Sequence, residues 1–249
     1  MRVIKMSGLG IVLFMFLGQT LWAAPSITTK TNSKAAIEKI STDLKRNLSQ
    51  LSPEAKKSSY KYLTKVSRSN GHSLAERWRA TVTLSRFYPK SGATTRSLQS
   101  RTWFLRNAAL LGLAESKPKL AIEWASKFIA GDRSLVVRTA AVDVLKKWPS
   151  KKVRGILRQN IDNKRNFKNG EPLWIRKNIL KALYSMSTKK DLPGIMSELK
   201  NNPDQQHVQY LINALPRISG QSINTSPFDS ERKAWLNWWE INKNQLINR

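Results

Sequence analysis

The sequence predicts an all-α fold: a right-handed α-solenoid of antiparallel helical hairpins, capped by a C-terminal helix. Apolar residues recur at helical spacing in units of 32 to 38 residues, which is the signature of a helical repeat array. Proline and glycine separate the units, and no run of alternating β-branched residues indicates a strand. With 249 residues, 40% of them hydrophobic, the chain is long enough to bury a continuous core.

Residues 1–23 have the features of a secretory signal peptide. Arg2 and Lys5 precede an apolar run over residues 8–18, and small residues follow at a cleavage site that we place after Ala23. The apolar run is too short to span about 30 Å of hydrocarbon, and no later segment approaches that length. We therefore expect a periplasmic or secreted protein with no transmembrane segment after cleavage.

Residues 24–94 are predicted to form atypical helices that cap the beginning of the array. Ser52–Arg68 and Ser73–Phe87 have the spacing of amphipathic helices, and residues 33–50 predict a less regular one. Pro53 marks a helix start, because a proline in the first turn loses no hydrogen bond. Terminal repeats of such arrays are expected to depart from the pattern.

Residues 95–219 carry the repeat itself. In its clearest unit the apolar residues lie at offsets 0, 4, 7, 8 and 11, which places them on one face of a helix. The frame starts at Leu105, Val137, Ile175 and Val208, at intervals of 32, 38 and 33 residues. Shorter helical patterns, beginning at Ala121, Val153 and Leu192, precede the last three frames. The repeating unit is therefore a helical hairpin.

Proline and glycine mark the expected ends of these helices. Helix starts are expected at Pro118, Glu171-Pro172 and Asn202-Pro203, and breaks at Gly131-Asp132, Trp148-Pro149 and Gly220. Pro216 is expected to end the last frame. The 38-residue unit contains an insertion, Asn160–Gly170, which we interpret as a loop; it is either part of a binding face or simply flexible.

Residues 220–249 are expected to form a linker and a tryptophan-rich capping helix, about Asp229–Gln245. Trp235, Trp238 and Trp239 fall within three helical turns, and we expect them to seal the open end of the core, because aromatic rings bury a large area. The alternative is an exposed aromatic platform for a partner.

The segment Gly131–Leu145 resembles HEAT or HEAT-like repeats of the bacterial two-helix kind. Asp132 stands at the turn aspartate of that family, and Val137-Arg138, Ala140-Ala141 and Leu145 match positions of its second helix. The resemblance covers about residues 95–219. It implies that the aspartate and the arginine bond to one another or to neighbouring repeats, so both are expected to be structural.

The same resemblance predicts an incomplete ladder of these contacts. Arg106 and Arg176 also occupy the arginine position, but Gln209 replaces it in the last unit. No turn aspartate precedes Arg106.

The chain is strongly basic, with 44 Lys and Arg against 16 Asp and Glu and a formal net charge of +28. Such self-repulsion destabilises a folded chain unless an anionic partner compensates it. The charge clusters in two stripes. One follows a single helix face through Lys57, Lys61, Lys65 and Arg68. The other lies between Lys146 and Lys181, and its candidate anion-binding residues are Lys151, Arg154, Arg158, Lys164, Arg165 and Lys168. Both stripes are either tracks for anions or solvated faces.

Catalytic and metal-binding patterns are absent from the sequence. The chain has no Cys, and His72 and His207 lie in different repeats, where we expect surface or capping roles. No nucleophile elbow, zinc-binding helix or phosphate-binding loop occurs. We therefore expect no enzymatic activity, no catalytic residues, no metal and no cofactor.

Two functions remain open at this point. The favoured one is an envelope scaffold that binds a protein partner on the face lined by the second helix of each hairpin. The other is a protein that binds polyanions, such as lipopolysaccharide, anionic lipid or cell wall, through the basic stripes. Nucleic acid is not an expected partner, because the signal peptide removes the chain from the cytoplasm and most tryptophans fall on core positions.

Overall fold

The computed structural model describes residues 33–223 and 228–247. The predicted signal peptide and its cleavage site lie outside these residues. Within them, no helix is both long and apolar enough to cross a membrane.

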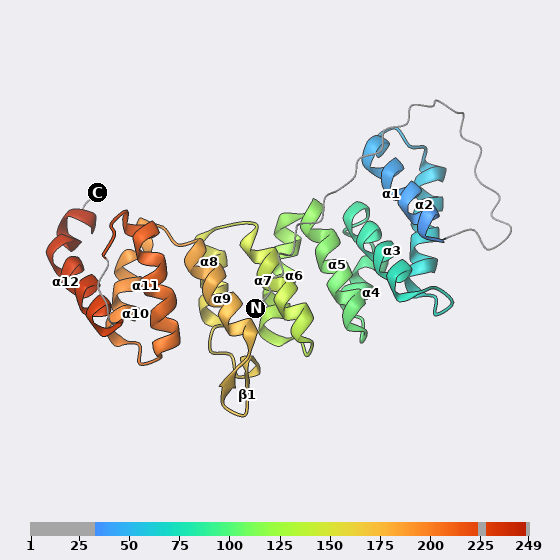
Figure 1. Ribbon diagram of the computed structural model, residues 1–249. Helices are drawn as coiled ribbons and strands as arrows, with labels where there is room; N and C mark the ends of the chain where they lie inside the picture. Colours follow the sequence, from blue (N-terminus) through green and yellow to red (C-terminus); the bar gives the residue numbers. More distant parts are fainter. Residues whose placement is uncertain (1–32, 224–227, 248–249) are drawn as a thin grey trace, which may run out of the picture. The chain divides into compact units, whose positions relative to one another are not determined.

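The described residues form twelve α-helices, which confirms the predicted all-α class (Figure 1). The helices are α1 (Ser33–Asn47), α2 (Pro53–Arg68), α3 (Leu74–Phe87), α4 (Gly92–Leu98), α5 (Trp103–Ser116), α6 (Pro118–Gly131), α7 (Leu135–Lys146), α8 (Lys151–Gln159), α9 (Trp174–Ser185), α10 (Leu192–Asn201), α11 (Gln205–Ser219) and α12 (Phe228–Ile247). Two short 3-10 helices, η1 (Lys164–Asn166) and η2 (Lys189–Asp191), and two short strands, β1 (Phe167–Lys168) and β2 (Glu171–Pro172), lie between them.

From α3 onward, two series of helices alternate along the chain. Helices α3, α5, α7, α9 and α11 pack successively, each against the next in this series. Each of α5, α7, α9 and α11 also packs against the helix that precedes it in the chain. Each of α5, α7, α9 and α11 thus forms a helical hairpin with the helix before it, and α3, α5, α7, α9 and α11 are called the second helices below.

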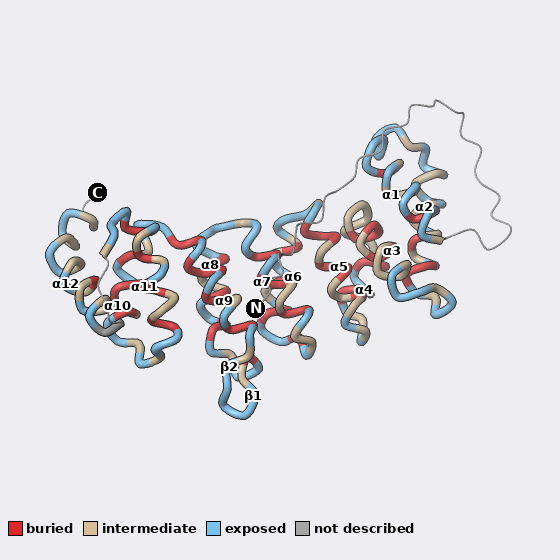
Figure 2. The backbone as a smooth tube through the Cα atoms, viewed as in Figure 1, coloured by how far each residue is buried: buried red, intermediate tan, exposed pale blue. Residues whose placement is uncertain are grey.

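The predicted apolar frames form the core. Their residues in α5, α7, α9 and α11 are buried, and Figure 2 shows buried positions recurring along these helices. Trp148, at the end of one frame, is only partly buried and packs against the same core. Leu98 to Trp235 contribute to one continuous cluster, whereas α1, α2, α3 and part of α4 share a second, smaller one.

The tryptophans of α12 lie against the end of the main core, as predicted. Trp235 is fully buried, and Trp238 and Trp239 pack against the same cluster. The rings of Trp235 and Trp238 meet edge to face, with centroids 5.5 Å apart. This arrangement buries aromatic area at the last hairpin, since α12 packs on α10 and α11.

Gly112 allows a close approach of helices α3 and α5. It occupies the frame position that Val144 and Ala182 hold in later repeats. A Cβ at this position would overlap the carbonyl oxygen of Val82 in α3. The backbones of α3 and α5 therefore approach each other more closely than any side chain at this position would permit.

Several predicted helix ends were wrong by a few residues. Helix α9 begins at Trp174 and α11 at Gln205, after the expected starts at Pro172 and Pro203. Asp204 caps α11 by accepting the His207 backbone N–H, so the start lies at the cap and not at the proline. Helix α11 also continues through Pro216 to Gly220, whose positive φ of 78° ends it.

The insertion Asn160–Gly170, expected as a loop, contains η1 and strand β1, which pairs with β2 in a short antiparallel hairpin. Asn169 and Gly170 form its turn, both with positive φ, as a two-residue hairpin requires. Asn-Gly is the sequence signal that could have predicted this turn. Helix α4 was also not predicted, and the expected boundary between residues 94 and 95 falls inside it.

Candidate functional site

The basic stripe on α2 is exposed and unpaired. Lys57, Lys61, Lys65 and Arg68 all face solvent, while Leu63 and Val66 of the same helix are buried. No carboxylate among the described residues lies within ion-pair distance of these four cations. The four side chains are therefore available to an external anion.

The basic face of α8 differs, because its two arginines bind carboxylates of the next hairpin. Arg154 Nε donates to Asp191 Oδ1 at 3.2 Å, and Arg158 Nε donates to Glu198 Oε1 at 2.8 Å. Lys151, one turn earlier, is exposed without an ion pair in the described structure. Arg154 and Arg158 thus hold α8 to η2 and α10, and their charges are already matched.

The other predicted anion-binding residues surround the β-hairpin. Lys164, Arg165 and Lys168 are exposed, and Lys168 lies opposite Glu171 in the strand pairing. The Arg165 carbonyl accepts a hydrogen bond from Arg138 Nη2 at 2.7 Å. The six residues of this predicted site therefore lie on three elements: Lys151, Arg154 and Arg158 on α8, Lys164 and Arg165 on η1, and Lys168 on β1.

Arginines in the first turns of the second helices form a ladder along one edge of the array. Arg106 in α5 donates from Nε and Nη2 to both carboxylate oxygens of Asp132, at 2.6 and 2.7 Å. Arg138 in α7 reaches the loop before α9, at the Arg165 carbonyl. Arg176 in α9 pairs with Asp204, the cap of α11. Each contact joins the beginning of one second helix to the segment that precedes the next.

The ladder contains the expected contact between Arg138 and Asp132 and one rung that was not expected. Arg138 donates to the main-chain oxygen of Asp132, not to its carboxylate, and Arg138 Nε has no partner among the described residues. Burial and the nearby Arg165 lower the pKa of Arg138. Sequence reasoning also missed a first rung, Arg77, which lies over the ring of Phe104 with its guanidinium carbon 5.2 Å from the centroid.

A hollow of about 970 Å³ lies beside this ladder, between the start of α5 and the turn from α6 to α7. Arg101, Trp103 and Arg133 line it and are exposed. Neither Arg101 nor Arg133 has a carboxylate partner in the described part of the chain. The carboxylate of Asp132 also lines the hollow, but Arg106 holds both of its oxygens. The hollow therefore combines a half-exposed indole with two free guanidinium groups.

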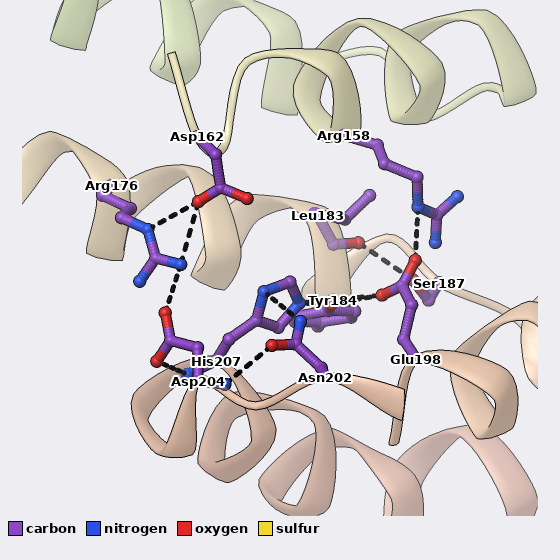
Figure 3. A network of polar contacts seen from close by, with 10 residues as sticks. All are labelled: Arg158, Asp162, Arg176, Leu183, Tyr184, Ser187, Glu198, Asn202, Asp204 and His207. Atoms are coloured by element: carbon purple, nitrogen blue, oxygen red, sulfur yellow. Dashed lines mark hydrogen bonds and ion pairs between the residues drawn. The ribbon is translucent and has the colours of Figure 1, made fainter. Parts of the chain in front are cut away.

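A buried polar network links α8, α9, α10 and α11 (Figure 3). The Tyr184 hydroxyl donates to Glu198 Oε2 at 2.8 Å, and Arg158 holds the other oxygen of this carboxylate. His207 Nε2 contacts the same hydroxyl, and the Asn202 amide donates to His207 Nδ1 at 3.1 Å. These roles fit a neutral imidazole with its proton on Nε2, because Nδ1 accepts and the tyrosine proton goes to Glu198.

The surroundings of this network favour an ionised Glu198 carboxylate and a neutral Tyr184 hydroxyl. Burial opposes ionisation of Glu198, but hydrogen bonds from His207 and Tyr184 and the charge of Arg158 outweigh it and lower the pKa of Glu198. Burial, together with the Glu198 carboxylate, raises the pKa of Tyr184. Tyr184 and His207 are almost fully buried, so the network holds helices together and presents neither ring to a ligand.

A second ion-paired group lies beside this network in Figure 3. Arg176 bridges Asp162, with Nε to Oδ1 at 3.0 Å, and Asp204. Burial opposes ionisation of Asp204, but the His207 backbone N–H and Arg176 outweigh it and lower the pKa of Asp204. Both carboxylates line a second hollow of about 700 Å³. Within the described residues, no three His, Asp or Glu side chains are arranged as ligands of a metal ion.

His207 was expected to have a surface or capping role: its side chain is buried and not on the surface, but its backbone N–H donates to Asp204, the cap of α11. It lies in the first turn of α11, where Tyr184 and Asn202 bind both of its ring nitrogens. His72 is partly buried, and its Nδ1 lies 3.1 Å from the Ser33 hydroxyl. The expectation that tryptophans lie mostly in the core fails at Trp103 and Trp174, which are about half exposed.

Comparison with known proteins gives no relative: no family model, curated protein or solved structure matches this chain.

Proposed function

We propose that this chain is a non-catalytic binding protein of the bacterial envelope, a basic scaffold that holds another protein. The observation that carries the proposal is the hollow at the start of α5, which Trp103 lines together with Arg101 and Arg133. Exposed tryptophan and arginine are the side chains that contribute most to binding energy at protein interfaces. The unbalanced positive charge would speed the approach of an acidic partner.

The arrangement of the helices in a right-handed, HEAT-like solenoid is part of the same proposal. The successive packing of the second helices and the arginine ladder between them support it. In such an array each hairpin contacts only its neighbours, so the second helices together offer an extended surface to a partner. The signal-like residues 1–23 support placing that surface in the periplasm or outside the cell.

Affinity capture tests this proposal. Purified chain, residues 24–249, is incubated with fractionated cell envelope and washed at low and then at high salt, and the retained protein is identified. A discrete protein that survives high salt is expected, because a packed interface depends less on screened charge than a polyanion contact does. If only lipid, polysaccharide or nucleic acid is retained and all of it leaves with salt, the scaffold proposal is wrong.

A hollow variant and a matched control locate the interface. The variant Arg101→Gln/Arg133→Gln removes the two arginines of the hollow that have no carboxylate partner among the described residues. The control Lys45→Gln/Lys119→Gln removes the same charge from two exposed positions on α1 and α6. We expect the hollow variant to lose the captured protein and the control to retain it. Equal retention by both variants would leave a protein-binding scaffold whose interface lies elsewhere.

One observation favours a second candidate function, the binding of anionic surfaces. The α2 stripe presents four exposed cations with no carboxylate partner among the described residues. Sedimentation with vesicles that contain phosphatidylglycerol, compared with neutral vesicles, tests it at about 50 and 200 mM salt. Binding only to the anionic vesicles, with a steep loss at the higher salt, is expected. Equal binding to neutral vesicles would contradict this candidate.

A further inference from the structure

Four exposed apolar side chains occupy equivalent places in four successive second helices. Leu74, Trp103 and Trp174 are the first residues of α3, α5 and α9, and Val136 is the second residue of α7. Their exposed fractions are 64%, 47%, 49% and 46%, respectively. Among the large hydrophobic residues that the structure describes, only Leu48 and Ile241 are also exposed. These four residues are called the apolar edge below.

The arginine ladder aligns these positions side by side. Arg77 in α3 lies over Phe104, the neighbour of Trp103 in α5. Arg106 joins α5 to Asp132, just before α7, and Arg138 joins α7 to the loop before α9. Because each of these contacts joins the first turn of one helix to the start of the next, the four apolar side chains follow one edge of the array.

The spacing of the apolar edge follows from helix packing. Packed helices lie about 8–10 Å apart, so adjacent members of the edge are separated by about that distance. A chain in the polyproline-II conformation rises about 3.1 Å per residue with three residues per turn. Every third side chain of such a segment therefore lies on the same face, about 9 Å from the last.

The charge around the apolar edge indicates which residues a partner segment would carry between its apolar side chains. Arg101 and Arg133 are exposed, have no carboxylate partner among the described residues and line the same hollow as Trp103, and Arg165 is exposed in η1, which precedes Trp174 in the chain. The carboxylates of Asp132 and Asp162 are already held by ladder arginines. A partner would thus meet positive charge beside the apolar contacts.

We infer that the apolar edge binds an extended, acidic segment of another protein, with an apolar side chain at every third residue. This inference rests on the proposed function and names the chemistry of the partner. The apolar residues of the segment contact Leu74, Trp103, Val136 and Trp174 in turn. Its acidic residues pair with Arg101 and Arg133.

A designed peptide tests this inference directly. The probe is a fluorescent twelve-residue peptide, of a length chosen to reach four anchors about 9 Å apart, with leucine at every third position and glutamate elsewhere. The control peptide has the same composition with its leucines adjacent. Anisotropy at about 150 mM salt gives both dissociation constants. We expect the spaced peptide to bind at least about tenfold more tightly than the control peptide.

Variants of the chain locate the binding. Trp103→Ala/Trp174→Ala is expected to weaken binding of the spaced peptide by at least about tenfold, because exposed tryptophans are typical interface anchors. Leu48→Ala/Ile241→Ala removes two exposed apolar side chains outside the edge and is expected to change binding less than about twofold. Circular dichroism checks that both variants remain folded.

Three outcomes would overturn the inference: no peptide binding, equal binding of the two peptides, or equal weakening by the two variants. The proposed function fails separately, when envelope capture yields no salt-resistant protein. If a protein is captured and the Trp103→Ala/Trp174→Ala variant still retains it, the scaffold proposal is supported, but the apolar edge does not bind that protein.

Discussion

Helices α2 and α8 carry the same sequence signal, a stripe of basic residues on one helix face, but the structure uses the two stripes differently. On α2, Lys57, Lys61 and Lys65 face solvent, and no described carboxylate pairs with them. On α8, Arg154 and Arg158 bind Asp191 and Glu198, which follow 37 and 40 residues later. One stripe is free for an outside anion, and the other holds two hairpins together.

The difference shows what a local charge pattern leaves open. Like charges at i,i+4 spacing repel by a few tenths of a kcal/mol on either helix, so the pattern itself does not distinguish them. The carboxylates of the next hairpin distinguish the two stripes, and the positions of these carboxylates depend on how the hairpins pack. The two stripes also differ in residue type. The paired members of the α8 stripe are arginines, whose planar guanidinium suits a carboxylate.

The largest expected difference between the stripes is in binding to anionic vesicles. Lys57→Gln/Lys61→Gln/Lys65→Gln is expected to cost about 3 kcal/mol, close to a 100-fold loss, because each Lys near such a surface contributes about 1 kcal/mol. Lys147→Gln/Lys151→Gln/Lys152→Gln makes the same charge change beside α8 and is expected to lose far less. Equal losses in vesicle sedimentation would mean that net charge, and not the α2 stripe, drives binding.

Charge reversal is expected to lower the free energy of unfolding more on α8 than on α2, the opposite order to the loss of vesicle binding. Arg154→Glu/Arg158→Glu places carboxylates next to Asp191 and Glu198 and should lower the free energy of unfolding by about 2–3 kcal/mol, since two ion pairs become repulsive. Lys61→Glu/Lys65→Glu on α2 should change it by less than about 0.5 kcal/mol. Urea unfolding measures both, and a similar cost on the two helices would contradict the structural role of the α8 arginines.

Removing one hydroxyl from the network that anchors α8 is expected to have a smaller effect. Tyr184→Phe removes the hydrogen bond to Glu198 and the partner of His207, and should cost about 1–2 kcal/mol of unfolding free energy. On α2, the Tyr60 hydroxyl has no hydrogen-bond partner in the described structure, so Tyr60→Phe is the matched control, with an expected change near zero. Thermal or urea unfolding of the two variants is the measurement.

The pH dependence of stability gives the finest test. The pKa of Glu198 is lower in the folded chain than the usual 4.5, so its ionised form stabilises the fold above about pH 4.5, and this stabilisation is lost as the pH falls further. Glu198→Gln is therefore expected to be less stable than the natural chain at pH 7, with the difference shrinking towards pH 3. Urea unfolding across this range measures it; a constant difference would contradict the assigned charge.

The core and most of the helices could be predicted because their signal is local. The frames in α7 and α9 place buried residues at fixed offsets, and these offsets identify a helix face without knowledge of its neighbours. Arg77 is the fourth residue of α3, as Arg106 is of α5, but no apolar frame was predicted for α3, so this rung was not recognised from the sequence.

The functional surfaces could be predicted only in part, because their definition requires the neighbours. Glu198 and His207 follow Tyr184 by 14 and 23 residues, and the three share no motif. Trp103 and Trp174 are of a residue type that is usually found in a core. They lie two and one positions, respectively, before the buried frame, where the start of the helix faces solvent. Exposure of this kind depends on where each helix begins, and helix starts were the least accurate part of the prediction.

The contact that Arg138 makes between successive hairpins is weaker than those of the other ladder arginines. The array therefore has a weak point at α7. Arg106 and Arg176 bind carboxylates, whereas Arg138 reaches only main-chain oxygens, and its Nε is unpartnered among the described atoms. In a chain of hairpins, cooperativity passes through neighbouring contacts, so a weak contact divides the array into blocks that open separately. We expect hydrogen exchange to distinguish two cooperative blocks, α3–α7 and α8–α12, with the β-hairpin before α9 as the first segment to open.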